Sequence, residues 1–168
     1  MKVAIYGQYY QNSTEPIIRD IFVFFNNHHV DMVIEATFLA TLYEKQIVKK
    51  EYKTFMSYNE LDNSFDMMIS IGGDGTILRA ATLVRDSGIP ILGINAGRLG
   101  FLASVQKENI DLFLKFVIDK KFSISERTLI SITSEPEIQE MTTLNFAMNE
   151  ISISRKDTTS MITIETYL

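Results

Sequence analysis

Along the first 126 residues, short continuous apolar runs alternate with segments whose apolar residues recur at helical spacing. Short apolar runs, typical of strands that are covered on both faces, span residues 2–6, 30–34, 67–71 and 89–94. Apolar residues at helical spacing follow these runs, over residues 14–25, 38–50, 76–85 and 110–118. Strands that alternate with helices indicate a parallel sheet. We therefore predict an α/β domain over residues 1–126, a parallel Rossmann-like sheet in three layers.

Residue chemistry near the ends of these segments predicts some of their boundaries. Thr14 is a suitable N-cap for the first helix, because Glu15 and Pro16 are both favoured in a first helical turn. The helix over 38–50 has a basic C-terminal end, which suits the helix dipole. Residues 51–64 are polar with scattered aromatic residues, and their pattern predicts no element.

The pattern changes near Arg127. Segments 129–133, 146–154 and 161–167 have the composition or alternation of strands, and no helix is predicted among them. We predict that residues 127–168 begin an all-β C-terminal domain. A few strands rarely form a stable domain alone, so we expect this domain to be incomplete in the chain.

Composition narrows the class of protein. Of the 168 residues, 46% are hydrophobic and 22% are charged, so extended disorder is not expected. The net charge of −5 argues against a general nucleic-acid binder. The chain has no cysteine, which excludes disulfides, thiolate metal sites and a cysteine nucleophile. No run approaches the roughly 20 apolar residues of a membrane span, and we expect a cytoplasmic protein.

The candidate chemistry lies in the sequence SIGGDGTILRA, residues 70–80. Glycines after a buried strand leave backbone N–H groups open, and a following helix adds its positive dipole end, which together suit a phosphate. Asp74 does not suit a simple phosphate site, because its carboxylate would repel a phosphate. A carboxylate at this place would have a function such as holding Mg²⁺ or accepting a proton. The simpler alternative is a turn in which Asp74 and Thr76 cap the helix. The sequence matches neither a Walker loop nor a G-x-G-x-x-G fingerprint.

Two further motifs identify a resemblance. GGDGT after an apolar strand resembles the signature of a superfamily that contains NAD kinases, diacylglycerol-type lipid kinases and phosphofructokinases. GINAGRLGFL at 93–102 and NEISI at 149–153 are similar to NAD kinase motifs in the same order. The resemblance implies an NAD kinase-like fold that covers the whole chain. The next family motif, rich in glycine and threonine, would lie beyond residue 168. Its absence implies a truncated C-terminal domain and puts the activity of this chain alone in question.

The resemblance implies a reaction and a catalytic residue. NAD kinases transfer the γ-phosphoryl group of ATP, or of polyphosphate in some members, to the 2′-hydroxyl of the adenosine ribose of NAD. Asp74 matches the proton acceptor of this family. Gly72 and Gly73 would line the phosphates, and Gly75 would allow the dinucleotide to approach closely. Arg79 would neutralise phosphate charge, although a solvent-facing helix arginine is an equal alternative. A divalent metal, Mg²⁺, is the expected cofactor of ATP.

The same resemblance implies further nucleotide contacts. Asn149 and Glu150 would bind the ribose and base. Ser160 stands near a position where many family members carry histidine, and Asp157 lies beside it as a weaker candidate. Two other predicted contacts are Phe101, as a pocket wall, and Asn95, as a hydrogen-bonding residue. The family also implies a homodimer or homotetramer, with no nucleic-acid or membrane partner.

Two alternatives remain at this point. A lipid or sphingoid-base kinase would share the glycine loop, but NEISI, GRLGF and the lack of a basic amphipathic helix argue against it. A module that binds a nucleotide without catalysis is the alternative from a different class.

Overall fold

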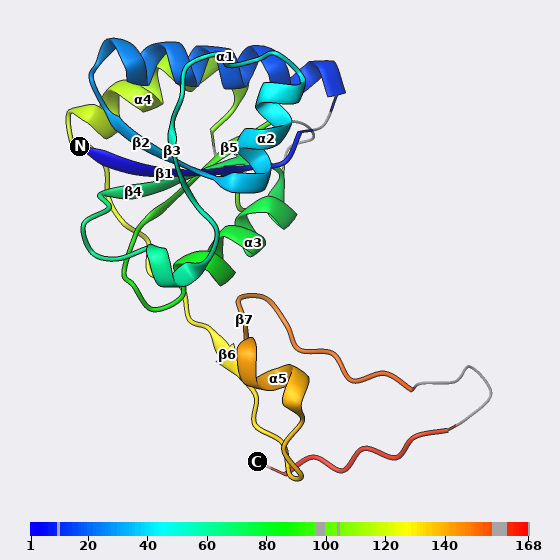
Figure 1. Ribbon diagram of the computed structural model, residues 1–168. Coiled ribbons are helices and arrows are strands. Elements are labelled where there is room, and N and C mark those ends of the chain that lie inside the picture. The colour runs from blue at the N-terminus through cyan, green and yellow to red at the C-terminus, as the bar shows by residue number, and fades with distance from the viewer. Residues whose placement is uncertain (10, 97–99, 104, 156–160, 168) are drawn as a thin grey trace. The chain divides into compact units, whose positions relative to one another are not determined.

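Five parallel strands form the central sheet of the computed structural model (Figure 1). They are β1 (Lys2–Gly7), β2 (Asp31–Glu35), β3 (Lys53–Phe55), β4 (Met67–Gly72) and β5 (Ile91–Asn95), in the order β3-β2-β1-β4-β5. The structure describes residues 1–168 except 10, 97–99, 104, 156–160 and 168. By its contacts the chain divides into two compact units, Met1–Ser125 and Glu126–Leu168, and each is described by itself.

Helices cover both faces of this sheet. The helices α1 (Gln11–Asn27), α2 (Ala36–Glu44) and α4 (Ile110–Ile118) share one apolar core with the strands. The helix α3 (Asp74–Val84) packs into a second core on the opposite face, together with Leu61 and Phe65. Two 3₁₀ turns, η1 (Tyr58–Glu60) and η2 (Lys107–Asn109), complete the unit. The prediction of a parallel three-layer α/β fold is confirmed.

The central strand β4 explains why the apolar runs are continuous. All six of its residues are buried. Ile69 and Ile71 contribute to the core under α1 and α4, whereas Met68 contributes to the core under α3. A strand that is covered on both faces favours apolar residues at successive positions, and Ser70 is the polar exception in β4. Strand β4 ends at Gly72, where the glycine loop begins.

The predicted N-cap of α1 and the predicted end of α2 were wrong. Helix α1 begins at Gln11, so Thr14 is a helical residue with a buried side chain rather than the N-cap. Helix α2 ends at Glu44, and the basic segment after it is not helical. Gln46 has a positive φ of 56°. The guanidinium of Arg19 donates to the carbonyls of Gln46 and Ile47, at 3.3 and 2.8 Å, which holds the chain away from the helical path.

The second unit is less regular than predicted. Strands β6 (Ile130–Ser131) and β7 (Phe146–Ala147) form one short antiparallel pair. The predicted strand over 161–167 is wrong, because those described residues have no regular secondary structure. Alternation alone does not form a strand when no neighbouring strand supplies hydrogen bonds. Helix α5 (Gln139–Thr143) was not predicted.

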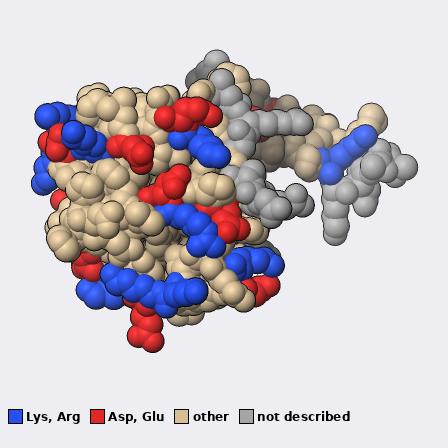
Figure 2. Space-filling view, turned by 90° about the horizontal axis from the view of Figure 1, so that it is seen from above, with Lys and Arg blue, Asp and Glu red and all other residues tan. Residues whose placement is uncertain are grey.

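Charged side chains are interspersed over the face that carries α1 and α4. Figure 2 shows Lys and Arg beside Asp and Glu on the part of this face that the structure describes, without a broad area of one sign. Among the described helices, none has the length and apolar character that crossing a bilayer requires.

Candidate functional site

The glycine loop makes a tight connection between β4 and α3. The amide of Ala96 donates to the carbonyl of Gly72 at 3.0 Å, which ties the loop to the segment after β5. A Cβ atom at Gly72 would overlap the side chain of Thr76, so only glycine fits there. In contrast, a Cβ atom at Gly73 or Gly75 would meet nothing within 4 Å. The outer side of the loop is therefore open for a ligand to approach the backbone.

Helix α3 begins earlier than the sequence predicts. It starts at Asp74 with Gly73 as its N-cap, whereas the predicted start was Thr76. Thr76 does not cap the helix, because its hydroxyl is buried and lies 3.4 Å from Oε1 of Gln8. Asp74 is consequently a first-turn residue, near the positive end of the helix dipole.

The carboxylate of Asp74 accepts three backbone hydrogen bonds from the segment after β5. Its Oδ2 accepts from the amide of Phe101 at 2.7 Å, and its Oδ1 accepts from Leu102 at 2.9 Å and from Ala103 at 3.1 Å. These amides, with Phe101 first, then Ala103 and Leu102, lower the pKa of Asp74 below its ordinary value. The side chain is thus held ionised in one orientation, with a lone pair of Oδ2 unused by these bonds.

Phe101, predicted to form part of a pocket wall, contacts Asp74 through its backbone. Its side chain is 100% exposed, so it does not form a pocket wall in this structure. What Phe101 contributes is the backbone amide that binds Asp74. Asn95, in contrast, is close to the loop: it pairs with Gly72 across the parallel strands, and its side chain is buried.

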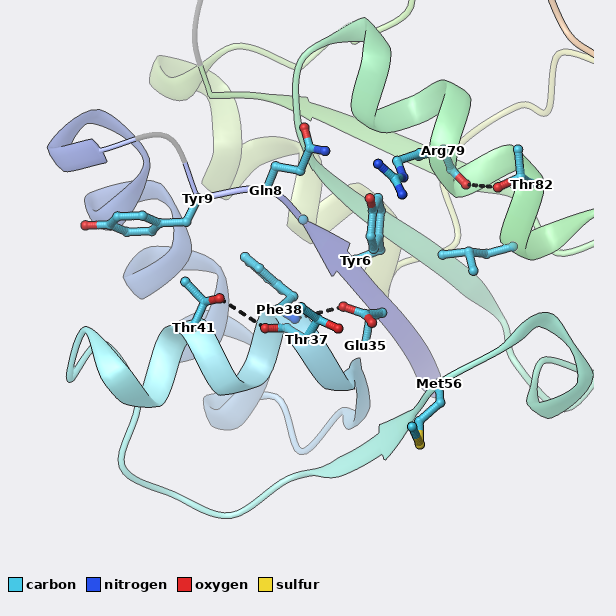
Figure 3. A pocket seen from close by; sticks show the side chains of 12 residues that line it. Tyr6, Gln8, Tyr9, Glu35, Thr37, Phe38, Thr41, Met56, Arg79 and Thr82 are labelled. Atoms are coloured by element: carbon cyan, nitrogen blue, oxygen red, sulfur yellow. Dashed lines mark hydrogen bonds between the residues drawn. The ribbon is translucent and has the colours of Figure 1, made fainter.

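Arg79 lies on α3 at the wall of an open pocket of about 700 Å³. The pocket is lined by the ends of β1 and β2 and by α2 and α3, with Tyr6, Gln8, Glu35, Phe38, Arg79 and Thr82 among its residues. Figure 3 shows the Arg79 side chain extending from α3 toward the end of β1. Within the described part of the chain, its guanidinium forms no hydrogen bond or ion pair, so the charge is available to an anion. The structure thus places Arg79 toward a cavity.

The residues of the loop do not build a cage for a metal ion. Asp74 is the only acidic residue of the GGDGT motif, and both of its oxygens already accept amide hydrogens. The described residues contain no group of three histidine, cysteine or acidic side chains that could hold an ion. A Mg²⁺ ion prefers several waters and phosphate oxygens to an all-protein site. Among the described residues, the loop therefore offers an ion at most the carboxylate of Asp74.

The remaining predicted residues belong to the second unit. Asn149 and Glu150 follow β7, and both side chains are exposed there. Asp157 and Ser160 lie outside the described residues.

Sequence reasoning missed two positions near the predicted site residues. A Cβ atom at Gly100 would overlap the Asp74 carboxylate, so this glycine allows the contact with residues 101–103. Glu35 ends β2 and lines the pocket. The sequence signal for Gly100 was its place in the GRLGF motif, and for Glu35 it was an acidic residue at the end of an apolar strand.

Comparisons with a family model and with individual proteins identify the same family. A family model described as the ATP-NAD kinase N-terminal domain matches residues 10–122. The NAD kinases of Flavobacterium johnsoniae and Christiangramia forsetii are 70% and 43% identical over the whole chain. The chain covers 57% of the length of each of these relatives.

A solved structure supports the fold. The crystal structure of yeast NADH kinase complexed with NADH matches with a TM-score of 0.60 and 21% identity. The match covers 77% of this chain and 41% of the yeast chain. At 21% identity, this match supports a similar fold and nothing further.

Proposed function

The chain belongs to the ATP-NAD kinase family, and on that premise we propose that its protein transfers the γ-phosphoryl group of ATP to the 2′-hydroxyl of NAD. The products are NADP and ADP. Because the chain spans only 57% of the length of its relatives, the activity is a proposal for the protein that contains it.

The oriented carboxylate of Asp74 is the observation that carries this proposal. Its two oxygens accept three amides, which leaves one lone pair of Oδ2 for an incoming hydroxyl. The ribose oxygen would attack the γ-phosphorus while the bond to the β–γ bridging oxygen breaks. The hydroxyl proton passes to Asp74 as this occurs. Since the amides lower the pKa of Asp74, the carboxylate orients the hydroxyl first and takes the proton late, when the oxygen has become acidic.

The glycine loop and Arg79 supply the complementary charge. The amides of Thr76 and Ile77 donate to the carbonyl of Gly73, whereas the amides of Asp74 and Gly75, at the positive end of the helix dipole, precede the first intrahelical acceptor, at a loop whose Gly73 and Gly75 are open. Arg79 would neutralise the phosphates of the donor from one helical turn farther on. Mg²⁺ would reach the site as the counter-ion of ATP and would stabilise the charge that develops on the transferred group.

Contacts with the acceptor come from several of the other predicted residues. Asn149 and Glu150 would bind ribose and base, with Ser160 and Asp157 as further contacts. Asn95 is buried beside Gly72 and would help to hold the loop, and the exposed ring of Phe101 would be free to pack on bound NAD. A homodimer or homotetramer and a cytoplasmic location stay predictions of the sequence.

The experiment is a phosphoryl-transfer assay of the purified protein with NAD, ATP and Mg²⁺. We expect NADP, measured with an NADP-specific dehydrogenase, and we expect Asp74→Asn to lower kcat by about 10²- to 10⁴-fold with NAD binding largely retained. Phosphorylated diacylglycerol in place of NADP would identify a lipid kinase instead. Nucleotide binding without any turnover would identify a non-catalytic module. Unchanged kcat in Asp74→Asn would contradict the proton-acceptor role.

A further inference from the structure

The pocket between β1, β2 and α3 has features of a nucleoside site that the reaction of Asp74 does not use. We infer that it binds the nucleoside of the triphosphate donor, with the carboxylate of Glu35 accepting hydrogen bonds from the ribose hydroxyls. This inference rests on the proposed function, because it locates the donor of that reaction. The cavity of about 700 Å³ lies within the usual range for a small-molecule site, roughly 300–1,000 Å³.

Glu35 lies at the carboxyl end of an interior strand of the sheet. It is the last residue of β2, and β2 lies next to β1 in the order β3-β2-β1-β4-β5. In doubly wound sheets, ligands bind outside the carboxyl ends of the strands, and an acidic side chain near this point hydrogen-bonds ribose hydroxyls. Glu35 thus offers the acceptor that a ribose requires, at the edge where nucleotides bind.

The carboxylate of Glu35 is held in position and keeps one oxygen available. Its Oε2 accepts the amide of Phe38 at 2.8 Å, which caps α2 and fixes the side chain. In the part of the chain that the structure describes, Oε1 has no hydrogen-bond partner, and no ion pair joins Glu35 to Arg79. A fixed, half-buried carboxylate with a free oxygen discriminates strongly between a ribose and an analogue that lacks its hydroxyls.

The rest of the pocket suits a nucleoside. Tyr6 and Phe38 provide buried aromatic surface for a base. Hydroxyl groups of Thr41 and Thr82 lie at the wall, where each donates to a carbonyl of its own helix and can still accept a hydrogen bond. Figure 3 shows these side chains around the same cavity as Glu35 and Arg79. Apolar walls with a few fixed polar groups are typical of ligand sites.

The location of the pocket relative to Asp74 indicates that the pocket binds the phosphoryl donor rather than NAD. Gln8 lines the pocket and contacts Thr76, so the pocket borders the β1 side of the glycine loop. The carboxylate of Asp74 is bound on the other side, by residues that follow β5. A triphosphate that extends from the pocket past Arg79 would reach the open backbone of Gly73 and Gly75. The acceptor hydroxyl would then meet it from the side of Asp74.

The test compares three ligands by isothermal titration calorimetry in the presence of Mg²⁺: ATP, 2′,3′-dideoxy-ATP and inorganic tripolyphosphate. We expect ATP to bind the wild type about tenfold or more tightly than dideoxy-ATP, because hydrogen bonds to a charged group are lost. In Glu35→Gln this ratio should fall several-fold, because a neutral amide replaces the charged acceptor, while tripolyphosphate binding stays unchanged. Gln at this position can still accept the Phe38 amide, so α2 keeps its cap. The matched control is Glu44→Gln on α2, outside the pocket lining, which should leave all three affinities unchanged.

Three results would overturn the inference. They are equal binding of ATP and dideoxy-ATP to the wild type, an unchanged ratio in folded Glu35→Gln, and displacement of ATP by saturating NAD, which would assign the pocket to the acceptor. If Glu35→Gln does not fold, the comparison of ligands on the wild type decides alone. Failure of this inference and failure of the proposed function are distinguishable. Equal binding with NADP still formed contradicts only the pocket, whereas a normal ribose preference with no NADP formed contradicts only the reaction.

Discussion

Gly100 lies against the carboxylate of Asp74 so closely that a methyl group at residue 100 would overlap it. The two residues are far apart in sequence, and their contact allows the amides of residues 101–103 to reach both carboxylate oxygens. The orientation and the ionisation of the proposed proton acceptor therefore depend on a position that carries no side chain.

Gly100→Ala should separate Asp74 from these amides. Since backbone hydrogen bonds lower the pKa of Asp74, the substitution should raise that pKa toward its ordinary value of about 3.9. A displaced acceptor should also reduce kcat, on the order of 10²-fold. Carboxyl ¹³C NMR titration of Asp74 measures the first effect, and the NADP assay measures the second.

The control for this variant is Gly88→Ala. Gly88 has a φ of 74° and open space around its Cα, so alanine there costs roughly 1–2 kcal/mol of folding free energy through strain alone. It should leave the pKa of Asp74 unchanged. An equal shift of that pKa in both variants would show that the effect of Gly100→Ala is not local.

The bound carboxylate also predicts a pH dependence of stability. Because the folded-state pKa of Asp74 is lowered, its charge stabilises the fold above the unfolded pKa of about 3.9, and this stabilisation is lost as the pH falls through the folded pKa. Asp74→Asn should therefore lower the urea midpoint at pH 7, and its difference from the wild type should shrink below pH 4 or so. The comparison needs the wild type at each pH, since the Ser64 hydroxyl and amide also lower the pKa of Asp62. A difference that persists undiminished in acid would point to a steric effect of asparagine.

Ser70→Ala should stabilise the protein. Ser70 is fully buried in β4, and its Oγ has no hydrogen-bond partner among the described residues. Removing a buried hydroxyl without a partner should raise the free energy of unfolding by about 1 kcal/mol. Urea denaturation measures this, with Ser64→Ala as a control at an exposed serine whose hydroxyl is hydrogen-bonded to Asp62. A less stable Ser70→Ala would mean that this hydroxyl is satisfied in solution.

Gly93 and Ile77 should be energetically coupled. A Cβ atom at Gly93 would overlap the Ile77 side chain and lie 3.2 Å from Cα of Ala103. Gly93→Ala should therefore cost about 1–3 kcal/mol, as overpacking does. Ile77→Val removes the overlapping Cδ1, so the double variant should recover part of that loss. Additive losses in the four-variant cycle would contradict the contact between β5 and α3.

The sequence predicted the parts of the fold that depend on local periodicity. Helix α4 has the predicted bounds, residues 110–118, because its apolar positions repeat at helical spacing and its core face is buried. The end of α2 was mispredicted because it depends on Arg19, a residue from another helix that binds the carbonyls of residues 46 and 47. Edge strand β3 has only three residues, too few for a period to be read.

The candidate site, like the fold, could be predicted only where it depends on residues that are close in sequence. GGDGT could be recognised because its residues are adjacent in the chain. The hydrogen bonds from Phe101 to Asp74 could not be predicted, since they link backbone amides to a side chain 27 positions away. The exposure of Phe101 was also unpredictable, because a motif identifies a residue and not the direction of its side chain. Glu35 gained a candidate role only when β2 was placed beside β1.

The hydrogen bonds that hold Asp74 have a consequence for mutational tolerance. All three donors are peptide groups, which every residue except proline possesses. Residues 101 and 102, which are not buried, can therefore change identity over generations while the carboxylate keeps its partners, whereas Ala103 is buried and leaves little room for a larger side chain. A library randomised at residues 101 and 102 should accept many side chains and reject proline, whereas a library at residue 100 should retain little besides glycine.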